Sequence, residues 1–192
     1  MTEYIYLFIG RSGSGKTTVA NYMKLFYRWK TVDSYTTRLP RYDGEEGHVF
    51  VTKEEFDRLP QRCAYTLFDD HEYCATSEQV DRADIYIIDP DGLDYFMKHY
   101  HGIKKPIAVW FDLPTQVLKK RLSERQGENF ISVERRMEND NKKFSKIEKQ
   151  LNYYDELNVL KITDPHWSPE TIGDVIANFD RGLKNEEVYC CS

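Results

Sequence analysis

Residues 10–17 read GRSGSGKT and match the pattern G-x-x-x-x-G-K-[ST], whose chemistry is phosphate binding. Its glycines let the backbone curl, so that successive N–H groups point inward and bind phosphate oxygens at a helix N-terminus. In this pattern Lys16 reaches the β- and γ-phosphates, and the Thr17 hydroxyl binds Mg²⁺. We therefore expect ATP and Mg²⁺ as cofactors. The residues expected to bind the nucleotide are Gly10, Ser12, Gly13, Ser14, Gly15, Lys16, Thr17 and Thr18.

A carboxylate further along the chain is suited to assist the metal. Asp89 ends the apolar run IYIID. A carboxylate at the end of a buried strand beside the phosphate loop can hold a water on Mg²⁺. Asp91 and Asp112 compete with Asp89 for this role, and we favour Asp89 because its strand is expected to lie beside the first strand of the sheet.

Two arginines predict a second anion site. Arg38 and Arg41 lie three residues apart in the turn-rich stretch SYTTRLPRYDGEEGHVFV, in a chain of formal net charge -5. A guanidinium binds a phosphate through two parallel N–H groups and stays charged. Together with the neighbouring hydroxyl side chains, the two arginines favour a site for an acceptor phosphate. The alternative is a solvated turn in which they pair with the acidic residues that follow.

The elements that must position these residues alternate along the chain. Short apolar runs rich in β-formers predict buried parallel strands, and amphipathic or capped segments between them predict helices. The expected strands are residues 4–9, 85–89, 107–112 and 159–163; the expected helices are residues 17–28, 52–59, a helix from Pro114, and residues 132–157 and 169–182. This order predicts an α/β fold of the P-loop NTPase type, with a parallel sheet flanked by helices.

Composition argues against several other classes of function. A net charge of -5 and a pI near 5.6 do not suit a protein whose main task is binding nucleic acid or an anionic membrane. No apolar run approaches the roughly 20 residues of a membrane-spanning helix. The four cysteines lack the spacing of zinc ligands. We expect a cytoplasmic monomer or homodimer with free thiols, whose partners are small-molecule nucleotides.

The motifs together resemble one known family. In chain order, the sequence carries GRSGSGKTT, SYTTRLPRYDGEEGHVFVTKEEFDRL, HEYCAT, IIDPDG and LKKRLSERQGENFISVERRM. These stretches are similar to the motifs of guanylate kinases, through about residue 163. The resemblance implies a single domain (1–192) whose core comprises residues 1–33, 76–124 and 144–185. It also implies an acceptor-binding region at 34–75 and a helical lid at 125–143.

By position, the resemblance also implies roles for single residues. Ser34, Arg38, Arg41 and Tyr73 match residues that hold the acceptor phosphate, His48 stands where the family has a tyrosine that contacts it, and Asp89 matches an aspartate near the base. Arg125 and Arg136 match lid arginines that act with Lys16 in catalysis. Arg121, on the preceding helix, either assists them or is helix surface.

The base-reading half departs from the family pattern. The guanine-reading glutamate falls on Ala64, a hydroxyl residue on Ala75, and the first of two aspartates on Ile87. Loss of a buried carboxylate removes a strong discriminator between bases. The acidic residues that could replace it are Asp69, Asp70 and Glu72.

The sequence therefore favours an ATP-dependent transfer of the γ-phosphoryl group to a (deoxy)nucleoside monophosphate, with GMP and dGMP among the candidates. Ribose 1,5-bisphosphate or another small phosphorylated acceptor is an alternative within the enzymes. A non-catalytic, peptide-binding module of the same fold is an alternative from another class, although the presence of Lys16, Arg125 and Arg136 argues against it. An ATPase or GTPase switch would not need the second arginine site.

Overall fold

The protein is built on a four-stranded parallel sheet with the strand order β6-β1-β7-β8. The computed structural model describes residues 2–68, 70–124 and 130–190. The strands of this sheet are β1 (Tyr4–Gly10), β6 (Ile85–Ile87), β7 (Lys105–Phe111) and β8 (Asn158–Ile162). All three pairings are parallel, which confirms the predicted fold class and each of the four predicted strands to within two residues at either end.

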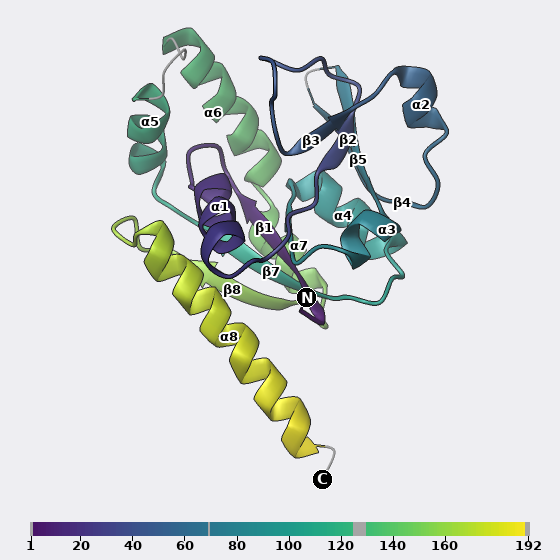
Figure 1. Ribbon diagram of the computed structural model, residues 1–192. Coiled ribbons are helices and arrows are strands. Elements are labelled where there is room, and N and C mark those ends of the chain that lie inside the picture. The colour runs from purple at the N-terminus through teal and green to yellow at the C-terminus, as the bar shows by residue number, and fades with distance from the viewer. Residues whose placement is uncertain (1, 69, 125–129, 191–192) are drawn as a thin grey trace.

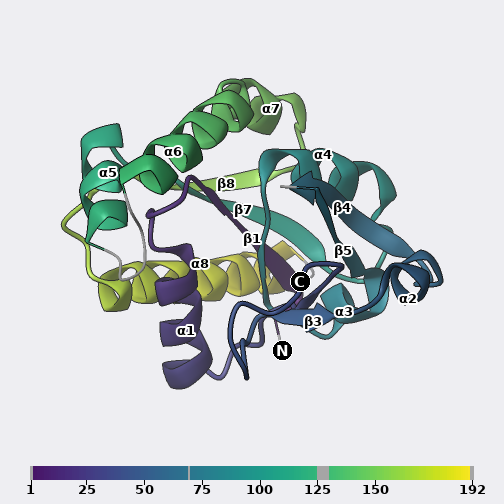
Figure 2. The same ribbon diagram turned by 90° about the horizontal axis from the view of Figure 1, so that it is seen from above.

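Helices cover both faces of this sheet (Figure 1). Seen from above, α1 (Lys16–Phe26) and α8 (Pro169–Cys190) lie on one face, and α6 (Phe130–Phe144) and α7 (Ile147–Tyr153) lie on the other (Figure 2). Strand β1 is buried along its whole length. Because side chains alternate across a strand, Tyr6 packs toward α1 and α8 while Leu7 packs toward α4 (Pro90–His99) and α7.

A second, smaller sheet has the strand order β3-β2-β5-β4 and lies beside the first (Figure 1). Its strands lie in nearly the same range as the acceptor-binding region expected at residues 34–75. Its strands are β2 (Ser34–Thr36), β3 (His48–Phe50), β4 (Arg62–Phe68) and β5 (His71–Thr76). Two short helices, α2 (Lys53–Asp57) and α3 (Ser77–Asp81), each begin with a capping box. Helix α5 (Thr115–Ser123) follows Pro114 as predicted.

Three predicted helices differ from the observed ones. The helix expected over 132–157 is two helices, because the chain breaks after α6, where the Ser145 hydroxyl donates to the carbonyl of Lys142 at 2.8 Å. The final helix runs eight residues further than predicted. The helix expected over residues 17–28 ends at Phe26, whose side chain is 63% exposed and whose ring packs on Tyr22 with centroids 4.5 Å apart. Within the described part of the chain, no helix is long and apolar enough to span a membrane.

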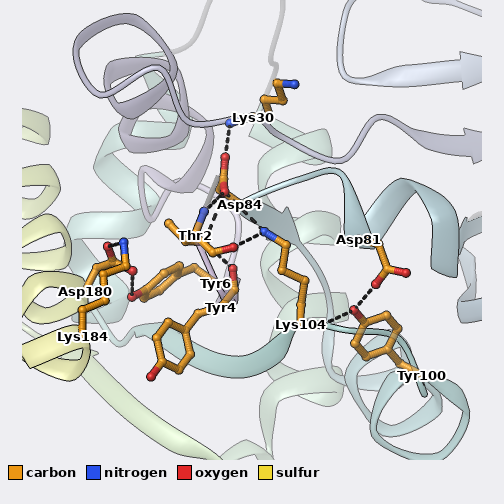
Figure 3. A network of polar contacts seen from close by, with 10 residues as sticks. All are labelled: Thr2, Tyr4, Tyr6, Lys30, Asp81, Asp84, Tyr100, Lys104, Asp180 and Lys184. Carbon is orange, nitrogen blue, oxygen red and sulfur yellow. Dashed lines mark hydrogen bonds and ion pairs between the residues drawn. The ribbon is translucent and has the colours of Figure 1, made fainter. Parts of the chain in front are cut away.

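A buried ion pair lies where the strands of the main sheet begin, at the end of the sheet opposite the phosphate loop (Figure 3). Lys104 Nζ lies 3.5 Å from Asp84 Oδ1, and the two side chains are 4% and 2% exposed. Asp84 also accepts the backbone N–H groups of Thr2 at 2.8 Å and Lys30 at 2.9 Å. Lys104 donates to the carbonyl of Thr2. These bonds join the segments that lead into β1, β6 and β7, so they hold the strand starts together.

Candidate active site

The phosphate loop lies between the end of β1 and the start of α1. Gly15, at the helix N-cap, has φ of 96°, a left-handed conformation that glycine adopts without strain. A Cβ atom on Gly10 would lie 2.9 Å from the Cβ of Phe111, so β7 and the loop approach too closely for a larger residue. Lys16 Nζ reaches over the loop and donates to the carbonyls of Gly10 at 2.5 Å and Arg11 at 3.0 Å. The loop thus has the curled form that the motif predicts.

Helix α6 docks against this loop. The backbone N–H of Ser12 donates to Asp140 Oδ2 at 2.5 Å, and the Arg11 guanidinium donates to Asn141 Oδ1 at 3.3 Å. Because spacings of four and seven residues return to one face of a helix, Arg136 and Lys143 share the face of Asp140. Arg136 thus lies one helical turn before Asp140 on the same side of α6, and its catalytic role stays a prediction. Arg125 lies outside the described residues.

The predicted acceptor-phosphate residues form a structured cluster. Arg38 Nε donates to the Tyr73 hydroxyl at 3.2 Å, which joins residues 35 positions apart. The Arg38 guanidinium also binds Glu45 through two bonds of 2.8 and 3.1 Å, and these side chains are 11% and 7% exposed. Arg41 is different, because its side chain is 65% exposed and its Nη1 atom is 3.9 Å from Glu45. The alternative predicted for this turn, that the arginines pair with the acidic residues that follow, is thus observed for Arg38 and Glu45. Arg38 is nevertheless not solvated, because it is buried beside Tyr73.

Ser34 and His48 face each other beside this cluster. They are partners in the register of β2 and β3, and Ser34 Oγ lies 3.0 Å from His48 Nδ1. The His48 ring is also 5.5 Å from the Tyr73 ring, measured between centroids. Burial, and then the nearby Arg38 cation, lower the pKa of His48 from its ordinary value of 6.5. The imidazole is therefore neutral at pH 7, so any hydrogen bond it makes to a phosphate is that of an uncharged donor.

One cavity of about 260 Å³ is lined both by the phosphate loop and by Ser34, His48 and Tyr73, three of the residues predicted to contact the acceptor. The phosphate loop forms one wall, the small sheet forms a second, and the end of α6 closes the side near Asp89. The residues on these walls include Gly10, Ser12, Lys16, Ser34, His48, Thr66, Phe68, Tyr73, Asp89, Asp140 and Lys143. Lys16 and Tyr73, predicted for opposite phosphates, thus open onto the same space.

The far end of this cavity differs from the family pattern, as the sequence suggested. Ala64 and Ala75 are cross-strand partners of β4 and β5, and both are fully packed in the core. Glu72, a candidate replacement for the lost glutamate, is bound instead by Lys53 Nζ at 2.5 Å and by the Tyr65 hydroxyl at 3.1 Å. Of the other two candidates, Asp70 is exposed in a turn, and Asp69 lies outside the described residues.

Asp89 follows β6 and is bound by groups from three parts of the chain. Its Oδ1 accepts the N–H of Gly92 at 2.8 Å, which caps α4. Its Oδ2 accepts from the Thr66 hydroxyl at 3.0 Å and from Lys143 Nζ at 2.6 Å. Sequence reasoning missed Thr66 and Lys143. The only available signal was that Lys143 lies seven residues after Arg136 on one helix, and among so many charges this spacing was not distinctive.

A second cavity, of about 410 Å³, opens on the other side of the phosphate loop. Residues 12–19 line it, together with Arg121, Trp167 and Ile172. Arg121 Nη2 donates to the carbonyl of Pro165 at 2.9 Å, which ties α5 to the segment before α8. Thr17 and Thr18, predicted to bind the nucleotide, are among the residues that line this cavity. Arg121 lines the same cavity and is therefore not plain helix surface.

Replacing Glu45 by glutamine gives a test of the Arg38 cluster by pH. The hydrogen bond from Arg38 lowers the pKa of Glu45 from 4.5 to about 2. A depressed carboxyl pKa contributes stability that is complete above pH 4.5 and is lost as the pH falls toward 2. We expect Glu45→Gln to be less stable than the parent at pH 7 and to approach it between pH 4.5 and 2, as measured by urea unfolding. Glu46→Gln, at an exposed neighbour, is the control; a deficit that does not change with pH would contradict the assignment.

Comparisons with known proteins support the fold. No protein-family model matches the sequence, and no curated protein matches it. A solved guanylate kinase from Anaplasma phagocytophilum is similar, with a TM-score of 0.58 and 20% identity over 95% of this chain and 86% of that chain. A sugar kinase from a Janibacter species has a TM-score of 0.49 and 14% identity, over 91% of this chain and 92% of that chain. The first likeness shows that this chain has a kinase-like α/β fold.

Proposed function

We propose that this protein is a kinase that transfers the γ-phosphoryl group of ATP to the phosphate of a nucleoside monophosphate. The observation that carries the proposal is the shared cavity, in which Lys16 of the phosphate loop and Tyr73, the partner of Arg38, open onto one space. A hydrolase or a nucleotide switch needs the first anion site but not the second. Two anion sites across one cavity suit a reaction between two phosphates.

The residues of the loop fit a magnesium nucleotide. The Thr17 hydroxyl follows Lys16 in the first turn of α1, where this motif binds Mg²⁺. When bound, the metal neutralises charge on the β- and γ-phosphate oxygens. Asp89 as a holder of a metal-bound water remains a prediction. Its carboxylate is 2.6 Å from an ammonium, and a second cation beside it would be repelled, so the geometry favours its role toward the acceptor.

The protein's part in the reaction is positioning and charge stabilisation. In this proposal the acceptor phosphate replaces Glu45 on the Arg38 guanidinium. Arg38 and Tyr73 then hold the phosphate so that one of its oxygens attacks the γ-phosphorus. The bond from that phosphorus to the β–γ bridging oxygen breaks, which yields ADP and a diphosphate. Lys16 and Arg136 stabilise the charge that develops on the transferring group. Docking of α6 over the loop excludes water, which favours transfer over hydrolysis.

The cavity favours a nucleotide acceptor over a sugar bisphosphate. Its end beyond Tyr73 is lined by the aromatic rings of Phe68, Tyr86 and Phe144 and by Asp89. Flat apolar rings suit a base, since aromatic faces stack on nucleobases. We therefore take a nucleoside monophosphate as the acceptor, with ribose 1,5-bisphosphate as the comparison compound.

A coupled assay of ADP release tests the proposal. ATP–Mg²⁺ is offered with each common ribo- and deoxynucleoside monophosphate and with ribose 1,5-bisphosphate. We expect stimulation by at least one nucleoside monophosphate well above the rate with ATP alone. A response to the sugar bisphosphate alone would change the acceptor class. No response to any acceptor would favour a non-catalytic module of this fold.

Replacing Arg38 by alanine tests the acceptor site. A hydrogen bond to a charged group contributes about 1.5–3 kcal/mol, so we expect the acceptor KM to rise about 10- to 100-fold while the KM for ATP stays nearly constant. Arg38→Lys keeps a cation beside Glu45 and guards against a folding defect, but it loses the planar fork and is expected to be intermediate. Arg58→Ala, at an exposed position directly after α2, is the control. Full transfer by Arg38→Ala at low acceptor concentration would refute the assignment.

A further inference from the structure

Lys143 of α6 lies in the first cavity, the one of about 260 Å³, where we propose that the acceptor base binds. Lys143 Nζ lies 2.6 Å from Asp89 Oδ2, 3.0 Å from Asp91 Oδ2 and 3.5 Å from Thr66 Oγ1. The Lys143 side chain is 21% exposed, and its ammonium lies 5.4 Å from the centroid of the Phe68 ring. Three separate parts of the fold meet here: α6, β4 and the start of α4.

The ammonium has a donor available for a ligand. A lysine ammonium carries three N–H groups, and two of them are used by the carboxylates of Asp89 and Asp91. Thr66 Oγ1, at 3.5 Å, is at the outer limit of a hydrogen bond. A better acceptor in the cavity would therefore take the third N–H. The Asp91 contact is itself weak, since that side chain is 63% exposed and exposed ion pairs contribute little.

The hydrogen-bond acceptor atoms in this cluster already have donors within the protein. The two Asp89 oxygens accept from Gly92, Thr66 and Lys143. The Thr66 hydroxyl gives its proton to Asp89, so it cannot donate to a ligand at the same time. What the cluster offers a base is chiefly a charged donor. A ring carbonyl oxygen placed here gains a charge-assisted hydrogen bond, whereas an exocyclic amino group would direct its own N–H groups toward an ammonium.

We propose that Lys143 is a specificity-determining residue that donates a hydrogen bond to a ring carbonyl of the acceptor base. The acceptors are then nucleoside monophosphates with an oxo group at the position where others carry an amino group, namely 6-oxopurines and 4-oxopyrimidines. This inference rests on the proposed kinase function and names the substrate class of the same site. Ala64 and Ala75, where the resemblance places base-reading residues, are packed in the core and offer no polar group.

Matched acceptors, compared between the wild-type protein and Lys143→Met, test this contact. IMP differs from AMP, and UMP from CMP, in an oxo group in place of an amino group and in a proton on the adjacent ring nitrogen, so the change in the ratio caused by the variant reports on Lys143. We expect kcat/KM of the wild-type protein to favour the oxo member of each pair by about 10- to 100-fold, the range of one charge-assisted hydrogen bond. Lys143→Met should reduce both ratios to within about 3-fold of unity, mainly through the KM of the oxo acceptor, with the KM for ATP unchanged.

Two further variants separate the contact from a general defect. Lys143→Arg keeps a charged donor and is expected to retain the preference for the oxo member. Lys142→Met removes a 73% exposed lysine from the adjacent position of α6 and should leave both ratios as in the wild type. Measured transfer without any oxo preference, or a preference that survives Lys143→Met, would overturn the inference and leave the kinase function standing. No transfer to any acceptor would overturn both.

Discussion

Replacing Lys16 by methionine is expected to lower the rate of phosphoryl transfer by about 100- to 1,000-fold, the effect of removing one preorganised donor from a developing anion. Methionine keeps the length of the side chain and removes its charge. In the structure the Lys16 ammonium reaches the carbonyls of Gly10 and Arg11, so it lies over the loop where we propose that the β- and γ-phosphates bind. The rate is measured at saturating ATP and acceptor, and ATP binding is measured separately by calorimetry.

Lys24→Met is the matched control for this prediction. Lys24 lies on the same helix, is 58% exposed and pairs only loosely with Glu46 at 3.7 Å. It should leave the rate and the thermal stability within about two-fold and about 0.5 kcal/mol of the parent. If Lys16→Met folds normally and transfers phosphate at more than a tenth of the parent rate, the loop does not stabilise the transition state of this reaction.

Replacing Lys104 by methionine is expected to lower the free energy of unfolding by about 3–5 kcal/mol, because it leaves the Asp84 carboxylate buried without its cation. Asp84 is 2% exposed and Lys104 is 4% exposed, and the pair joins the starts of three strands (Figure 3). A loss of this size is a large part of the stability of an ordinary domain. Urea unfolding followed by circular dichroism measures it.

An exposed ion pair of the same protein provides the comparison. Glu78 and Arg82 lie 2.7 Å apart on successive helical turns, with side chains 65% and 75% exposed. Glu78→Gln should change stability by no more than about 0.5 kcal/mol. Removing both buried charges in Lys104→Met/Asp84→Asn should be less harmful than the sum of the two single changes, since neither charge is then left alone. A loss below about 1 kcal/mol for Lys104→Met would show that the pair is not a structural link.

Some parts of this protein could be predicted because their physical causes are local. The phosphate loop is eight consecutive residues, and glycine spacing alone allows the backbone to take its curled form, as Gly15 shows. Strand β1 is an unbroken apolar run, so burial on both faces follows from its composition. The alternation of such runs with helices was sufficient to predict the parallel sheet, and the observed pairings confirm it.

Other parts depend on packing between distant segments. The segment 132–157 forms two helices rather than the one predicted, because after Ser145 the chain turns so that Ile147 and Leu151 pack in the core. The sequence does not reveal this break, since the helical spacing of apolar residues continues across it. The roles of Arg38, Tyr73 and Asp89 came from a resemblance and stay predictions. The residues that contact them could not be predicted from residue types. In a highly charged helix, the sequence does not distinguish a lysine that lines a cavity from one exposed to solvent.

The phosphate-loop motif and the α/β class were therefore contained in the chain's own pattern, because the loop is eight consecutive residues and the alternation of apolar runs with amphipathic segments is a local feature of the sequence. The shape of the acceptor end depended on the tertiary structure. Lys143 meets Asp89 and Thr66 across separations of 54 and 77 residues, and it does so only after α6 has docked on both sheets. Hydrogen bonds of this kind need side chains that folding alone brings together, so base recognition was the part of the site that sequence left open.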